Sequence, residues 1–314
     1  MIPCPGLPLR RNAEAVEPAP GERCGGPAAT VGGRIAALAA AFFLSLALAA
    51  CAPTNGTGGG KGSLDSGQPP ALWNAFIAGS GAQVRSFSLS ASLSVQSPQK
   101  SARLLVRFWG DLEKPLRLDL STGMGQTFSM WREDSLGWLA IYPLSNQAFT
   151  HPDTKTALSK LNMPLPFGLK ELAAISTGRY GLILPGAFKG VRKTSSGYEY
   201  ALAQPCPVGS VTLDFEGKPI HFTGRGVEPW TADLGDFPPA ASGERDVQGD
   251  LGREFAARKI QLTTPGGLRV ILLVKKLELS PTPMAPETLE LPLPPGARHI
   301  PLDRPGDVRA PDMP

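Results

Sequence analysis

The segment Ser86-Phe87-Ser88-Leu89-Ser90-Ala91-Ser92-Leu93-Ser94-Val95 alternates serine with apolar residues without a break. Successive side chains of a β-strand point to opposite faces. The apolar residues therefore share one face, and the five serines share the other. This pattern predicts a strand that buries one face and leaves the other polar.

Further alternating segments follow along the chain and are separated by turn residues such as Pro, Gly, Asn and Asp. Short connections between successive strands indicate an antiparallel meander. The strands expected before the middle of the chain are residues 102–109, 116–120, 126–131 and 138–142. Those expected after it are residues 198–202, 211–215, 220–223, 257–263 and 268–279.

Three helices are expected. The first is short and covers residues 72–77, and the second covers residues 154–161 with Asp153 as its N-cap. The third follows a Pro-x-Pro segment and ends near Gly178. Residues 228–253 are rich in Pro, Gly and Asp, so they are expected to form a loop. The proline-rich tail from residue 281 either wraps the domain or stays loose.

These elements predict an α+β, mainly β fold, in which one antiparallel sheet is interrupted by two mid-chain helices. A large antiparallel sheet twists and curls. Its apolar face needs a cover, and the helices are the candidates for it. The alternation alone does not distinguish a packed core from a cavity.

The N-terminal region carries a second signal. Leu48-Ala49-Ala50-Cys51 closes an apolar run that begins at Ile35, directly after Arg34. Such a run before small residues is typical of a secretory signal. The cysteine after Leu-Ala-Ala resembles a bacterial lipobox, which predicts lipid attachment at Cys51. A plain transmembrane helix is the alternative, although the run is shorter than the roughly 20 residues that span a bilayer.

This signal divides the chain into four parts. Residues 1–50 are a removed leader, residues 51–70 are an acylated cysteine and polar tether, residues 71–280 are the folded domain, and residues 281–314 are the tail. Ala52, at the position where aspartate commonly marks retention in the inner membrane, favours the outer membrane.

Composition and motifs argue against several functions. The whole chain has a net charge of +4, and removal of the leader takes away one positive charge. The remaining charge is too small to indicate a surface that binds nucleic acid. Cys206 has no partner in the mature chain, so it is interpreted as an inert thiol. The three histidines have no catalytic or metal-ligand spacing, and no nucleophile elbow occurs. We therefore expect no enzyme, no metal and no cofactor.

The folded part resembles the LolA/LolB lipoprotein-localisation family. The resemblance rests on a lipobox and tether, Trp73 in a first helix, Arg107-Phe108-Trp109 on a strand, and Asn162-Met163-Pro164-Leu165-Pro166 before a helix. It covers roughly residues 71–280. It implies a curved antiparallel sheet, an incomplete β-barrel with a helical lid.

The resemblance also implies a function. In this family, the cavity of the curved sheet binds the acyl chains of a passenger lipoprotein. A LolA-like periplasmic carrier delivers the passenger to the receptor, which inserts it into the outer membrane. The chain would then be a monomer anchored to the membrane, with an apolar cavity. The residues expected to line this cavity are Leu89, Leu93, Leu104, Phe108, Leu118, Leu165, Phe167, Leu169 and Leu172.

A loop with one exposed apolar residue helps insertion in this family. It corresponds here to residues 121–126, with Met124 between Gly123 and Gly125. In the alternative interpretation, Met124 folds back onto the sheet. An alternative function is a lipoprotein of the same fold that binds another lipid or serves as an assembly scaffold.

Overall fold

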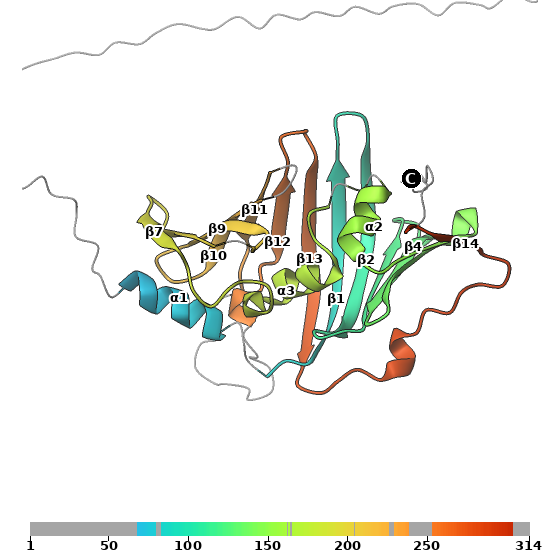
Figure 1. The fold of residues 1–314 in the computed structure, drawn as a ribbon, viewed down its shortest axis with the longest axis horizontal. Helices are drawn as coiled ribbons and strands as arrows, with labels where there is room; N and C mark the ends of the chain where they lie inside the picture. The colour runs from blue at the N-terminus through green and yellow to red at the C-terminus, as the bar shows by residue number, and fades with distance from the viewer. Residues whose placement is uncertain are drawn as a thin grey trace, which may run out of the picture. The chain divides into compact units, whose positions relative to one another are not determined.

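The computed structural model describes residues 68–79, 83–161, 163, 165–203, 205–225, 229–238 and 253–303. Cys51, the leader and residues 52–67 of the predicted tether lie outside these residues. The described residues form one sheet and three α-helices (Figure 1). The helices are α1 (Gln68–Gly79), α2 (Thr154–Lys160) and α3 (Leu169–Thr177).

The sheet has 14 strands in the order β14-β6-β5-β4-β3-β2-β1-β13-β12-β11-β10-β9-β8-β7. Every described pairing is antiparallel except that of β14 with β6. The sheet curves and stays open, which confirms the predicted mainly β fold. The strands of one half are β1 (Ser86–Gln96), β2 (Ser101–Asp111), β3 (Leu116–Ser121), β4 (Thr127–Asp134), β5 (Gly137–Tyr142), β6 (Gln147–His151) and β14 (Arg298–Pro301). Those of the other half are β7 (Gly190–Lys193), β8 (Tyr198–Ala201), β9 (Val208–Leu213), β10 (Pro219–Gly224), β11 (Trp230–Gly235), β12 (Lys259–Thr263) and β13 (Arg269–Ser280).

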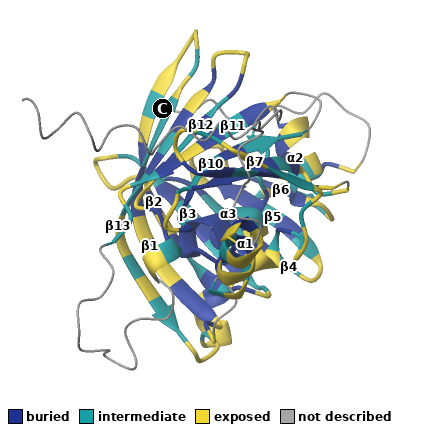
Figure 2. Cartoon of the chain, turned by 90° about the vertical axis from the view of Figure 1, so that its left-hand side faces the viewer, coloured by how far each residue is buried: buried dark blue, intermediate teal, exposed yellow. Residues whose placement is uncertain are grey.

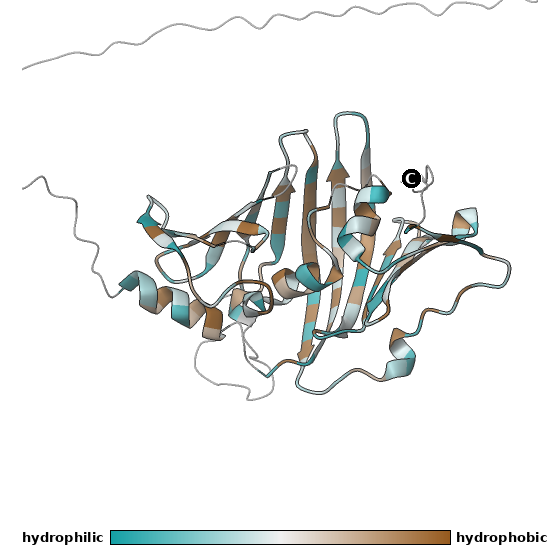
Figure 3. Cartoon of the chain, viewed as in Figure 1, coloured by the Kyte–Doolittle hydropathy of each residue, from teal (hydrophilic) through white to brown (hydrophobic). Residues whose placement is uncertain are grey.

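The strand that opened the sequence analysis is β1, at the middle of the sheet. Its apolar residues pair in register with apolar residues of β2, as Leu89 does with Phe108 and Leu93 with Leu104. Together they make one apolar face, here called the inner face. The alternation is visible as coloured bands along the long strands (Figure 3).

The helices cover the inner face, as predicted. α2 contacts β5 and β6, and α3 contacts β3 and β13. α1 buries Trp73 and Phe76, and the Trp73 indole donates a hydrogen bond of 2.9 Å to the carbonyl of Gly186. Buried residues concentrate on the strands between these helices, whereas the turns are exposed (Figure 2). Among the described residues, no helix has both the length and the apolarity to cross a membrane.

The cap predictions are confirmed. The Asp153 carboxylate accepts a hydrogen bond of 2.8 Å from the Thr156 N–H at the start of α2. α3 ends at Gly178, whose φ of +73° is the left-handed conformation that favours glycine.

Four strands were not predicted, namely β6, β7, β11 and β14. β11 lies inside the segment expected to be a loop, so that expectation was wrong for residues 230–235. β11 does alternate, with Trp230, Ala232 and Leu234 buried, but it is short and flanked by breakers. β7 contains only four residues. β14 pairs in parallel with the distant β6, and a local pattern does not reveal such a partner.

The part of the proline-rich tail that the structure describes wraps the domain and does not stay loose. Residues 281–303, here called the C-terminal strap, cross the outer face of the sheet. The Trp109 indole donates a hydrogen bond of 3.0 Å to the carbonyl of Thr288. Leu291 packs on Ile141 and Ala148, after which β14 adds to β6. Orange-to-red residues trace this path in Figure 1.

Candidate functional site

The nine residues predicted to line a cavity all belong to one apolar cluster on the inner face. Leu89, Phe108 and Leu118 form a row across β1, β2 and β3, because Leu89 pairs with Phe108 and Phe108 with Leu118. Their exposed fractions are 2%, 1% and 3%. The sheet register alone therefore brings these three predicted residues together.

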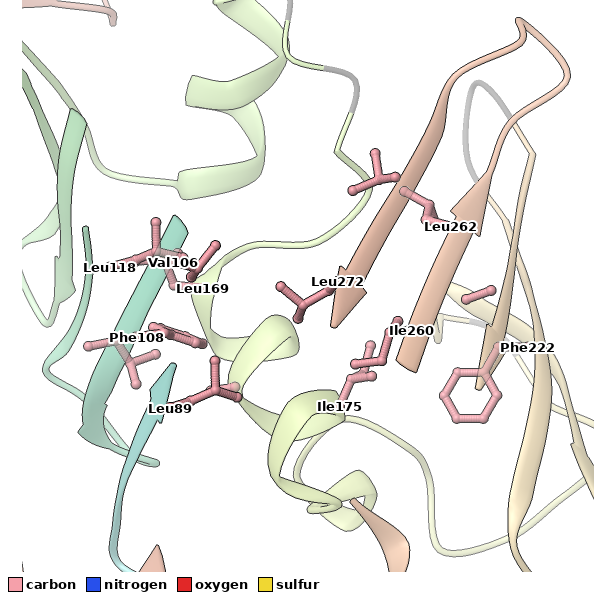
Figure 4. Packing of buried hydrophobic residues seen from close by; sticks show 14 of the residues in the cluster. Leu89, Val106, Phe108, Leu118, Leu169, Ile175, Phe222, Ile260, Leu262 and Leu272 are labelled. Carbon is pink, nitrogen blue, oxygen red and sulfur yellow. The ribbon is translucent and has the colours of Figure 1, made fainter. Parts of the chain in front are cut away.

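The helical lid supplies the opposite side of this cluster. Leu169 of α3 is buried against the row, whereas Leu172 is half-buried. Figure 4 shows Leu169 beside Val106 and Leu118, and Ile175 of the same helix beside Ile260 of β12. α3 thus lies between the two halves of the curved sheet and packs against both.

The Pro-x-Pro segment before α3 crosses the inner face. Its residues Leu165 and Phe167 are half-buried. The Phe167 ring meets the Trp230 ring of β11 edge-on, with centroids 4.6 Å apart. Leu93 of β1 is also half-buried, although its partner Leu104 is only 1% exposed. The inner face is therefore less tightly covered at these positions than along the central row.

Two carboxylates hold the N-terminus of α3. Glu133, on the inner face of β4, accepts a hydrogen bond of 3.1 Å from the Leu169 N–H and lies 2.8 Å from the Lys114 ammonium. Glu171 accepts a hydrogen bond of 3.0 Å from the Gly168 N–H and lies 2.6 Å from the Lys155 ammonium. Negative charge at a helix N-terminus is stabilising. This end of the lid is thus fixed to the sheet by polar contacts.

Sequence reasoning missed a group of buried polar atoms on the inner face of β4 and β5. The Trp131 and Trp138 indole nitrogens and the Tyr142 hydroxyl lack a well-formed hydrogen bond to any described residue. The two indole rings meet edge-on, with centroids 5.6 Å apart. Burial raises the pKa of Tyr142 well above its usual value, and the nearby Trp131 opposes this shift. Buried donors of this kind are suited to a polar group of a ligand or to water.

The two best-defined hollows among the described residues are lined by other residues than the nine predicted ones. One hollow, of about 510 Å³, lies beside the β2–β3 turn and includes Arg85, Leu112 and Arg179 in its lining. Another, of about 440 Å³, lies where β5 and β6 meet the C-terminal strap. The central row of the inner face is buried against Leu169 of α3, so a ligand has to displace part of the lid to reach this row.

The predicted insertion loop forms a tight turn between β3 and β4. The Thr122 N–H donates to the Gln126 carbonyl at 2.9 Å, and the Gly125 N–H donates to the Thr122 carbonyl at 2.9 Å. Gly125 has φ of +83°, which explains a glycine there. Met124 is 93% exposed, so it does not fold back onto the sheet. A Cβ at Gly123 or Gly125 would meet nothing within 4 Å.

The cysteine and the histidines that could carry chemistry do not lie together in one site. Cys206 is half-buried, with its Sγ 3.9 Å from the Ile183 carbonyl. His221 pairs with Asp233 at 2.6 Å, whereas His151 and His299 have other neighbours. Within the part of the chain that the structure describes, no three His, Cys, Asp or Glu residues could hold a metal ion.

Comparison with known proteins gives fold-level likeness only. No protein-family model and no curated protein matches the sequence. Among solved structures, a LolA superfamily protein from Nitrosomonas europaea aligns at 7% identity, over 71% of this chain and 97% of that chain, with a TM-score of 0.46. A protein domain from Vibrio parahaemolyticus described as outer membrane lipoprotein-sorting aligns at 11% identity, over 67% and 91% of the two chains, with a TM-score of 0.40. A DUF1329 family protein from Desulfovibrio piger aligns at 9% identity, over 70% and 95%, with a TM-score of 0.46.

Proposed function

We propose that the protein is an outer-membrane lipoprotein, anchored through Cys51, that accepts other lipoproteins from a periplasmic carrier and inserts them into the outer membrane. The observation that carries the proposal is the pairing of two features on one sheet. A continuous apolar inner face lies under a helical lid, and Met124 stands 93% exposed at a turn of the same sheet. Binding and delivery involve no covalent chemistry.

The inner face would bind the acyl chains of the passenger. Its predicted lining residues are aliphatic or aromatic and already form one cluster. An acyl chain that buries a few hundred Å² of apolar surface gains several kcal/mol, at ~25 cal/mol per Å². The buried indole N–H groups of Trp131 and Trp138 would meet the polar ester or amide groups near the head of the chain.

Loading would require the lid to move, because Leu89, Phe108 and Leu118 are buried. The lid is held at the N-terminus of α3 by Glu133 and Glu171, and across the inner face by the Phe167–Trp230 contact. These polar and aromatic contacts cluster at residues 167–169, and the buried apolar face of α3 adds to them. Displacing the segment from residue 163 to residue 177 would expose the row formed by Leu89, Phe108 and Leu118.

A transfer assay tests the proposed function. The segment Lys61–Pro314 is one compact unit that contains every residue of the described core, so it can be studied without the leader. It is mixed with a LolA-like carrier loaded with a labelled lipoprotein and is then recovered by pull-down. We expect the label to move to this protein. A folded protein that takes no label but carries another lipid would contradict the receptor function.

That second outcome defines the alternative function, a lipoprotein of the same fold that binds another lipid. This alternative would use the same group of buried donors as the receptor function, formed by Trp131, Trp138 and Tyr142. Such donors suit a ligand whose polar group enters the interior with its chains. Extraction of the purified protein and mass spectrometry of the bound lipid distinguish the two functions.

Met124 carries the delivery step of the proposal. Met124→Glu places a charge at the exposed tip of the loop, so we expect passenger binding to remain and delivery from this protein into outer-membrane vesicles to fall at least tenfold. Leu136→Glu is the matched control, because Leu136 is 90% exposed in the turn between β4 and β5 at the other end of the strands. Equal delivery by the Met124→Glu and Leu136→Glu variants would exclude the loop from insertion.

A further inference from the structure

Antiparallel pairing brings every second connection of the sheet to the same side, here called the upper edge, and four of these connections are hairpin turns that the structure describes in full. They join β1 to β2, β3 to β4, β5 to β6 and β12 to β13. The tall β1–β2 and β12–β13 hairpins end at the top of Figure 1. The four turns are residues 97–100, 122–126, 143–146 and 264–268.

Two of these turns present exposed apolar side chains. Met124 is 93% exposed, and Leu144, in the β5–β6 turn, is 64% exposed. Two strand spacings, roughly 10 Å, separate the two turns. The β5–β6 turn is held in place, because the Asn146 side-chain amide donates a hydrogen bond of 2.9 Å to the Gly296 carbonyl of the C-terminal strap. Leu144 is therefore presented on a fixed turn beside Met124.

The charge of the upper edge is positive. Lys100, Arg103 and Arg269 are exposed at the β1–β2 and β12–β13 hairpins. Arg103 pairs with Ser94 and Arg269 with Gln96, so the two arginines lie on either side of β1. Neither aspartate nor glutamate occurs in the four turns.

The opposite side of the sheet, here called the lower edge, has a different composition. Its turns carry Glu113, Asp214 and Glu216 together with Lys114 and Lys218, and Asp134 is the last residue of β4 at the same edge. Leu136 is 90% exposed there, directly after Asp134. Exposed leucine thus occurs at both edges, but the four fully described turns of the upper edge contain no acidic residue and lie beside exposed basic residues. The β10–β11 connection on the same side carries Arg225 and Glu228 in its sequence, which leaves the positive charge of the edge unchanged.

We propose that the upper edge docks on an anionic lipid bilayer, with Met124 and Leu144 inserted and Lys100, Arg103 and Arg269 against the lipid headgroups. Basic residues near a bilayer are attracted by anionic lipids, and an apolar side chain gains by entering the acyl region. Acidic residues would repel such a surface, which excludes the lower edge. This docking needs no passenger, so it stands whether the interior carries a lipoprotein or another lipid.

Vesicle binding of the segment Lys61–Pro314 tests the proposal. The protein is sedimented with vesicles of phosphatidylcholine, with and without a quarter of phosphatidylglycerol. We expect binding that requires phosphatidylglycerol and weakens as salt is raised. Equal binding to the two kinds of vesicle, or binding to neither, would overturn the proposal.

Substitutions assign the binding to the upper edge. We expect the combined variant Lys100→Gln, Arg103→Gln and Arg269→Gln to weaken binding to the anionic vesicles at least tenfold. The matched control removes three exposed charges elsewhere and is expected to bind within about twofold of the parent. That control is Lys170→Gln, Lys193→Gln and Lys275→Gln. An equal loss in both triple variants would show a general charge effect and overturn the assignment.

The second apolar contact has its own pair of variants. Leu144→Ser is expected to weaken vesicle binding about fivefold, whereas Leu136→Ser on the lower edge leaves it unchanged. Equal binding by these two variants would overturn the role of Leu144. Passenger transfer from a loaded carrier in solution is measured beside each binding assay. Failure of that transfer contradicts the proposed receptor function and leaves the docking result to stand by itself.

Discussion

Glu133 offers a direct test of how the helical lid is held. Its side chain is 9% exposed, accepts the Leu169 N–H and pairs with Lys114, whose side chain is 32% exposed. Glu133→Gln keeps the size of the side chain and its carbonyl acceptor but removes the negative charge at the start of α3. The free energy of unfolding is expected to fall as a result.

The magnitude follows from three contributions. A hydrogen bond to a charged group contributes about 1.5–3 kcal/mol, part of which the amide retains. A negative charge at a helix N-terminus contributes about 0.3–1 kcal/mol. The ion pair with the partly exposed Lys114 contributes about 0–1 kcal/mol, because water screens it. We therefore expect Glu133→Gln to lower the free energy of unfolding by about 2 kcal/mol.

The same substitution is expected to raise ligand affinity. If the lid must open for loading, weakening its closed state by about 2 kcal/mol increases the open population by up to about 30-fold. Urea unfolding measures the stability, hydrogen exchange at the first amides of α3 measures the opening, and a fluorescent fatty acid measures the affinity. Glu113→Gln, in the exposed β2–β3 turn, is the control and should change the stability by less than about 0.5 kcal/mol.

Two results would refute this reasoning. Unchanged hydrogen exchange in α3 would show that Glu133 does not hold the helix. Lower stability and faster exchange with unchanged fatty-acid affinity would show that α3 opening does not control access to the interior.

The remaining predictions concern α2 and the C-terminal strap. Hydrogen bonds from Thr156 hold the pKa of the Asp153 carboxyl below its usual value, so its stabilisation is present above about pH 4 and is lost as the pH falls through the folded-state pKa. Asp153→Ala should cost about 1 kcal/mol at pH 7, and urea unfolding at lower pH should show this difference disappear. Leu291→Ala, at a site 6% exposed, should cost about 2 kcal/mol in urea unfolding. Leu293→Ala, at a site 49% exposed, should cost less than about 0.5 kcal/mol, and equal costs would contradict the packing of the strap.

The sequence predicted the sheet well where the alternation was long. β1 pairs on both sides at the centre of the sheet, so its serines and apolar residues had to separate onto two faces. The caps at Asp153 and Gly178 were also predictable, because capping is a local interaction. The positions of β11 and β14 were not, since β11 is short among breakers and β14 depends on a distant partner.

The residues of the candidate site could be predicted from the sequence, but whether they enclose a cavity could not. Leu89, Phe108 and Leu118 do gather on one face. Periodicity reports which side chains turn inward, but not whether the lid fills the space between them. The donors of Trp131 and Trp138 were missed because tryptophan in a strand is counted as an apolar residue, and the surroundings of its indole nitrogen are evident only in three dimensions.

The C-terminal strap gives the two walls of the molecule different mechanical properties. It leaves the end of β13, is bonded to Trp109 and Arg117 on the outer face, and finishes as β14 beside β6. The wall from β2 to β6 cannot change its curvature without breaking these bonds. The wall from β12 to β7 is tied differently, by α1, whose residues Gln68 and Pro69 accept hydrogen bonds from the Tyr198 and Tyr200 hydroxyls of β8. An interior that swells to admit a ligand would therefore expand on the side held by α1, while the strap keeps the wall that carries Met124 at a constant curvature.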